Sequence, residues 1–139
     1  MATYTKFLDY VEQLNKAVHN WSSHTFKAAL TNTAPVNTNT VFANLTEISA
    51  GNGYTAGGTG ATISSSAQTS GTYKLVIADL TLTASGGSVA PFRYVVIYND
   101  TATNDELIGF YDYGSDLTLA NGESLLIDFS AANGMIQLS

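Results

Sequence analysis

Hydrophobic and polar positions alternate with two different periods along this 139-residue chain. Near the N-terminus, apolar residues recur at steps of three and four, the spacing of one face of an α-helix. We therefore expect an amphipathic helix over residues 4–21. Its apolar stripe consists of Phe7, Val11, Leu14, Val18 and Trp21, with Leu8 beside it. Such a helix could pack on its own domain or reach onto a neighbouring subunit as an arm, and the pattern leaves both open.

From residue 25 onward the period changes to two, which is typical of half-buried β-strands. The segment at 92–98 would carry apolar residues on both faces of a strand, which predicts a strand in the middle of a sheet. The apolar phase shifts around Ala78–Asp79, as it does at a bulge or bend. The polar segment 61–68 is expected to form an edge strand. The other strands expected on this pattern cover residues 25–30, 73–77, 80–82, 107–113 and 135–138.

Turn residues separate these segments. Asn121-Gly122 favours a type I′ turn, so residues 117–119 and 125–129 are expected to form a hairpin. Gly114-Ser115 is expected to end the strand before it, and Asn133-Gly134 to form a further turn. The remaining connections are a loop at 32–39, a segment at 41–48 that reads as either helix or strand, and a glycine-rich stretch at 51–58.

Short antiparallel strands at nearly regular spacing predict a mainly β fold, a sandwich or jelly roll with one N-terminal α-helix. The length suits a single domain over residues 1–139, with the helix or arm at 4–21 and the sandwich at 25–139.

The composition of the chain excludes some classes of binding partner. Charged residues make up 12% of the chain and its net charge is −6, with five scattered basic residues. Without a basic cluster to neutralise phosphates, neither nucleic acid nor an anionic membrane is an expected partner. No cysteine is present, which excludes disulfides and thiolate metal sites. No apolar leader or long apolar run is visible, so synthesis in the cytosol is expected. A sparsely charged surface is easily desolvated and favours protein contacts.

Candidate chemistry is sparse. The histidines, His19 and His24, flank the end of the expected helix without a nucleophile elbow nearby. Acidic residues gather further on, in a spacing that fits a calcium loop or a pair of glycosidase carboxylates only loosely. They are Asp100, Asp105, Glu106, Asp112 and Asp116. A helix-terminal role for the histidines and a solvated loop for the acids explain both better, so no catalytic, cofactor or metal residue is expected.

Several motifs carry a resemblance to a known family. In order they are Asn-Gly-Tyr-Thr-Ala-Gly-Gly at 52–58, Gly-Thr-Tyr-Lys-Leu-Val at 71–76, Phe-Arg-Tyr-Val-Val-Ile-Tyr-Asn-Asp-Thr at 92–101, Leu-Ile-Gly-Phe-Tyr-Asp-Tyr-Gly at 107–114, Asn-Gly-Glu at 121–123 and Ile-Asp-Phe at 127–129. This order resembles the small virion proteins of tailed bacteriophages, and among them the capsid cement or decoration proteins. The resemblance covers most of the chain and implies no catalytic residue.

The resemblance implies a small jelly roll that sits on the outside of a phage head and bridges subunits of the major capsid protein. It further implies a homo-oligomer, with a trimer favoured, located in the virion after synthesis in the host cytoplasm. The acidic balance fits an exterior position, since an interior protein would face packaged DNA.

Apolar side chains on the expected arm and in the polar loop are the candidate contacts with other subunits. They are Phe7, Val11, Leu14, Trp21, Pro35 and Val36. Three alternatives remain open: a tail, neck or baseplate component, a carbohydrate-binding module that uses some of the eight tyrosines, and a glycosidase.

Overall fold

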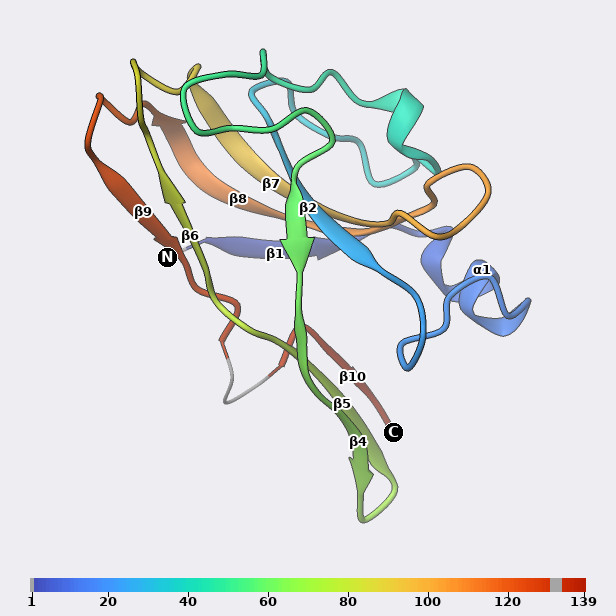
Figure 1. Cartoon of the computed structure of the whole chain (residues 1–139). Coiled ribbons are helices and arrows are strands. Elements are labelled where there is room, and N and C mark those ends of the chain that lie inside the picture. The colour runs from blue at the N-terminus through green and yellow to red at the C-terminus, as the bar shows by residue number, and fades with distance from the viewer. Residues whose placement is uncertain (1, 131–133) are drawn as a thin grey trace.

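The computed structural model describes residues 2–130 and 134–139, and Figure 1 shows how its elements are arranged. The named strands pair antiparallel. One short α-helix lies between the first and second strands. The largest sheet has the strand order β1-β8-β7-β2-β3. Its strands are β1 (Thr3–Lys6), β8 (Leu107–Leu117), β7 (Phe92–Asn99), β2 (Phe26–Thr31) and β3 (Thr59–Ala61). The mainly β, antiparallel fold predicted from the sequence is confirmed.

Two smaller sheets complete the β-structure. One has the order β10-β5-β4 and the other pairs β6 with β9. Their strands are β4 (Ile63–Thr69), β5 (Thr72–Ile77), β6 (Leu80–Thr83), β9 (Ser124–Ile127) and β10 (Ile136–Leu138). In Figure 1 the β4–β5 hairpin projects away from the five-stranded sheet, whereas β6 and β9 lie in front of it.

The main core lies between one face of the five-stranded sheet and the smaller sheets. Phe26 and Leu30 of β2 are buried there with Leu75 and Ile77 of β5 and with Ile127 of β9. Sheets that share a buried face in this way form a sandwich. The finer jelly-roll topology stays a prediction.

Strand β7 occupies the centre of the large sheet, as its apolar pattern predicts. Val95 and Ile97 enter the main core, whereas Tyr94, Val96 and Tyr98 enter a second core on the opposite face. Successive side chains of a strand point to opposite faces, so only a strand covered on both sides needs apolar residues throughout.

The segment between β2 and β3 covers this second face. Phe42 and Leu45 pack against the second core, and the Phe42 ring stacks on Tyr98 with centroids 4.5 Å apart. The Thr31 hydroxyl donates to the carbonyl oxygen of Thr46 at 2.5 Å and ties the segment to β2. The segment contains a 3₁₀ turn, Phe42–Asn44, with isolated β-bridges at Val41 and Glu47, so residues 41–48 form neither an α-helix nor a regular strand.

The expected helix over 4–21 is wrong in extent. Residues 3–6 form β1, and the α-helix α1 covers only Tyr10–Asn15. The stripe is divided because Phe7 is buried in the second core, whereas Trp21 belongs to the main core and Leu14 packs against it. The two cores lie on opposite faces of the large sheet, so residues that enter both cores cannot lie on one face of a single helix.

Two expectations about the C-terminal half are also wrong. Strand β8 does not end at Gly114-Ser115 but continues to Leu117, because its pairing with β7 shifts between the Tyr94–Asp112 and Phe92–Leu117 pairs. Residues 117–119 do not pair with β9, which pairs with β6 instead. Only Gly122 of the Asn121-Gly122 turn has a positive φ, 91°, whereas a type I′ turn needs two.

Other expectations are met. The first strand, the polar edge strand and the last strand appear as β2, β4 and β10. The phase shift at Ala78–Asp79 marks where the chain leaves the three-stranded sheet and enters β6. Asp79 fixes this bend because its carboxylate accepts a hydrogen bond from the backbone N–H of Phe129 at 3.0 Å. The expected turn at Asn133-Gly134 lies partly outside the described residues.

Candidate protein-binding surface

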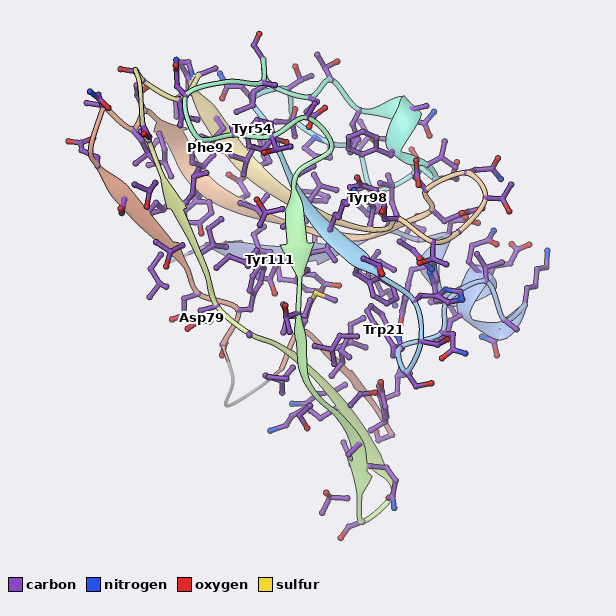
Figure 2. The ribbon with its side chains drawn as sticks, viewed as in Figure 1. Trp21, Tyr54, Asp79, Phe92, Tyr98 and Tyr111 are labelled. Atoms are coloured by element: carbon purple, nitrogen blue, oxygen red, sulfur yellow. The ribbon has the colours of Figure 1, made fainter. Side chains whose placement is uncertain are left out.

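The six predicted contact residues fall into three groups. Phe7 and Trp21 are buried in the chain's own cores, with 0% and 9% of their surface exposed. In Figure 2 Trp21 lies beside the chain that enters β2, and its ring stacks on Phe26 at 4.1 Å. These two residues hold the fold together, and their prediction as contacts with other subunits is corrected. Val11 and Leu14 form the second group, and Pro35 and Val36 the third.

Val11 and Leu14 line a groove of about 420 Å³ between α1, β1 and β10. Val11 is 46% exposed and Leu138, on the opposite wall, is 45% exposed. The other lining residues are Tyr4, Lys6, Tyr10, Asn15, Met135, Ile136 and Gln137. The groove is therefore mainly apolar, and its two walls come from opposite ends of the chain. We call it the α1–β10 groove.

Packed aromatic rings form the base of the groove. The Trp21 indole N–H donates to the Tyr10 hydroxyl at 3.1 Å, and the Tyr10 ring stacks on His19. Burial raises the pKa of Tyr10 to about 12. The Tyr4 ring packs on Tyr111 with centroids 5.1 Å apart, and burial raises the pKa of its hydroxyl as well. These contacts give the groove a rigid base, which lowers the entropy cost of binding a partner.

Backbone pairing fixes the wall formed by the N-terminal segment. Strand β1 pairs with β8 from the Thr3–Asp112 pair to the Lys6–Gly109 pair. The N–H of Phe7 then donates to the carbonyl oxygen of Ile108 at 3.1 Å. The segment is therefore docked on its own sheet, as one of the two sequence-based alternatives proposed, and the apolar residues it leaves exposed belong to α1.

Pro35 and Val36 lie in the 32–39 loop, which meets the N-terminal segment at Leu8. The N–H of Leu8 donates to the carbonyl oxygen of Asn37 at 3.0 Å, which brings the two segments together. Leu8 is 58% exposed and Val36 is 56% exposed. The sequence pattern includes Leu8 only as a neighbour of the helix stripe, so its place beside the 32–39 loop was missed.

Leu138 was also missed, although β10 carries a signal for it. Ile136 and Leu138 are two residues apart in a strand and share a face, where Ile136 is buried and Leu138 is half exposed. Its position opposite α1 depends on the pairing of β10 with β5, which a single sequence does not reveal.

The two histidines meet at one buried amide. The Asn99 side chain is fully buried, and its amide nitrogen lies 3.1 Å from His19 Nδ1 and 3.0 Å from His24 Nδ1. The same nitrogen also lies 3.2 Å from the carbonyl oxygen of Val18, so the two hydrogens of this amide serve three acceptors. Burial lowers the pKa of His19 to about 4. The cluster links the turn after α1 to β7, which is a structural role.

Three of the five acidic residues are held by separate partners. Arg93 binds Asp112 through two hydrogen bonds of 2.8 and 3.1 Å, and Lys27 pairs with Asp100 at 3.1 Å. Glu106 accepts from the side chain of Asn104 at 3.1 Å. Among the described residues, no group of three or more histidines and carboxylates could hold a metal ion. The absence of catalysis expected from the sequence stays a prediction.

Comparison with known proteins adds no further constraint, because no family model, curated protein or solved structure matches the chain. Within the described residues, no helix is long and apolar enough to span a membrane.

Proposed function

We propose that this chain is a structural protein that binds other protein subunits through the α1–β10 groove. The observation that carries the proposal is the pair of half-exposed apolar walls, Val11 and Leu138, over a rigid aromatic base. Burial of apolar side chains is the main driving force for protein association, and pre-packed surfaces gain most from it. Completing the burial of each wall residue would contribute about 1 kcal/mol.

The assembly we propose is the head of a tailed phage, with this chain as a capsid cement protein on its outer surface. Support comes from the resemblance of the motifs to such virion proteins, from the acidic charge and from the β-rich fold. Each copy would bridge subunits of the major capsid protein. A small groove repeated over many copies gains affinity through multivalency, so one site need not bind tightly.

A binding assay with purified phage heads that lack the protein tests this function. We expect the wild-type chain to co-sediment with heads, and Val11→Asp and Leu138→Asp to weaken binding about tenfold or more, because each buries an unpaired charge. Leu126→Asp is the matched control, since Leu126 is 57% exposed on β9, away from the groove residues.

Binding of all three variants at wild-type affinity would overturn the groove as the contact surface. Binding to tails or necks in place of heads would favour the alternative virion position. No observation favours a carbohydrate-binding module, since each of the fifteen aromatic side chains is buried or partly buried.

A further inference from the structure

Strand β4 forms one edge of the three-stranded sheet, and no strand among the described residues pairs with its outer side. Six of its seven residues are exposed. Figure 1 shows the β4–β5 hairpin projecting from the body of the molecule, so this edge is open to another chain. Unpaired backbone groups along such an edge are a template for one more strand.

Beyond its first residues, the edge lacks the features that normally prevent such pairing. Edge strands are usually protected by charged residues, prolines or bulges. Between Glu47 and Lys74 the chain has no charged residue, and β4 has no proline. A register shift lies between Ile63 and Ser65, so the regular part of the strand is Ser65–Thr69.

The hairpin turn identifies which backbone groups face outward. Ser70 and Gly71 form a two-residue loop with φ of 50° and 83°, as in a type I′ turn, which closes on the Thr69–Thr72 pair. That closing pair is hydrogen-bonded within the hairpin, and hydrogen-bonded and open pairs then alternate along the ladder. The open positions are Gln68 and Ser66, so their N–H and C=O groups point away from β5.

We propose that this edge pairs with the same edge of a second copy, antiparallel, about a twofold axis that passes through Ala67. In that register Ser66 of each copy faces Gln68 of the other, and all four outward groups of each strand edge are used. Ala67 then faces Ala67 of the second copy at an open pair, where Cα atoms approach to about 4.5 Å. Alanine has the smallest side chain that keeps a Cβ, so this close approach is free of steric conflict.

Charge favours a second copy as the occupant. Copies that each carry a net charge of −6 repel one another over most of their surface. The stretch at residues 48–73 carries no charge, so β4 is a place where two copies can meet without like-charge pairs. A contact limited to one strand edge is small, so we expect weak association that is visible at high protein concentration.

Charge substitution at the proposed axis tests this pairing. Sedimentation equilibrium of the full chain up to about 1 mM should show a concentration-dependent dimer, in the range expected for a weak contact. Ala67→Lys and Ala67→Glu should each weaken it about tenfold or more, because like charges then oppose each other at the axis. An equimolar mixture of the two variants should associate again, as a heterodimer. Thr118→Lys and Thr118→Glu, at an exposed position after β8, make the same changes in net charge and should associate like the wild type.

Circular dichroism and thermal unfolding of every variant should match those of the wild type, which checks that the fold is intact. A wild-type chain that stays monomeric at all concentrations would overturn the proposal, as would association that ignores Ala67 or a mixture that fails to recover. The inference does not rest on the proposed function, because the residues tested in the groove are Val11 and Leu138 and those tested here are on β4. Failure of one therefore leaves the other standing.

Discussion

Ala17 ends α1 in a conformation that costs energy. Its φ is 62°, in the left-handed region that a Cβ disfavours. The N–H of Val18 donates to the carbonyl oxygen of Gln13 at 2.9 Å and that of Ala17 to Leu14 at 3.2 Å, which together form a Schellman motif. Glycine is the usual residue at this position because it adopts the conformation without strain.

We therefore expect Ala17→Gly to stabilise the protein by about 0.5–1 kcal/mol, as measured by urea denaturation. Ala43→Gly is the control, because Ala43 lies in the 3₁₀ turn without a positive φ. In the Ala43→Gly variant, glycine raises the conformational entropy of the unfolded chain and relieves no strain, so a loss of stability is expected. Equal losses at both positions would contradict the strain assigned to Ala17.

His19 should make stability depend on pH. Burial of its ring lowers the pKa to about 4, while the charges of Glu106 and Asp9 oppose this shift and that of His24 adds to it. In the unfolded chain the ring binds a proton near pH 6.5. Between these values the unfolded state holds more protons, so stability is full above about pH 6.5 and falls as the pH drops toward 4, by about 3 kcal/mol.

Urea denaturation at several pH values from 7 to 4 checks this dependence against His19→Gln. Glutamine keeps an acceptor for Asn99 but does not titrate in this range. We expect the wild type to lose about 3 kcal/mol more than the variant over this range, since carboxylates contribute equally to both. If the free energies of unfolding of the two proteins changed equally with pH, His19 would not be held neutral by the fold.

At the scale of elements, β1 depends on a glycine in its neighbour. A Cβ at Gly109 of β8 would lie 2.4–2.6 Å from the ring of Tyr4, which therefore packs directly on the glycine backbone. Gly109→Ala should displace Tyr4 and loosen β1, with a loss of about 1–3 kcal/mol. Such a change would also open one wall of the α1–β10 groove.

Thermal unfolding of Gly109→Ala and of the control Gly60→Ala measures this effect. Gly60 lies on β3 of the same sheet, with open space where a Cβ would be. Shortening Tyr4 to Leu in the Gly109→Ala background should recover part of the loss, because a smaller side chain leaves room for the new methyl group. Unchanged stability of Gly109→Ala would contradict the close packing.

Elements were predictable where local pattern alone decides them. The position of β7 follows from its apolar residues on both faces, and the polarity of β4 marks it as an edge. The N-terminal stripe misled because steps of three and four also fit a short strand followed by a short helix. Phe7 and Leu14 are seven residues apart on the predicted stripe, yet Phe7 lies in the second core and Leu14 packs against the main core. Only the assembled sheet determines that division.

The partner of β9 could not be predicted for a similar reason. Asn121-Gly122 favours a local hairpin, but the N–H of Gly122 donates to the carbonyl oxygen of Ala84, and that of Ala84 to Glu123. These contacts with the end of β6 direct β9 toward it. Likewise, Val11 and Leu138 are 127 positions apart in the sequence, and no local pattern places them across one groove.

At the scale of the whole molecule, apolar, uncharged and charged surfaces occupy different places. The α1–β10 groove is apolar, the β4 edge is polar but uncharged, and the ion pairs of Lys27 and Arg93 lie on the large sheet. A structural subunit with one surface for a partner protein and another for its own copies would use such a division to keep the two contacts independent.

A reconstruction of phage heads decorated with the protein would show whether the α1–β10 groove binds other subunits. We expect density for the chain on the outside of the head, with Val11 and Leu138 covered by the major capsid protein. A chain seated on the head with this groove facing solvent, or found only elsewhere in the particle, would contradict it.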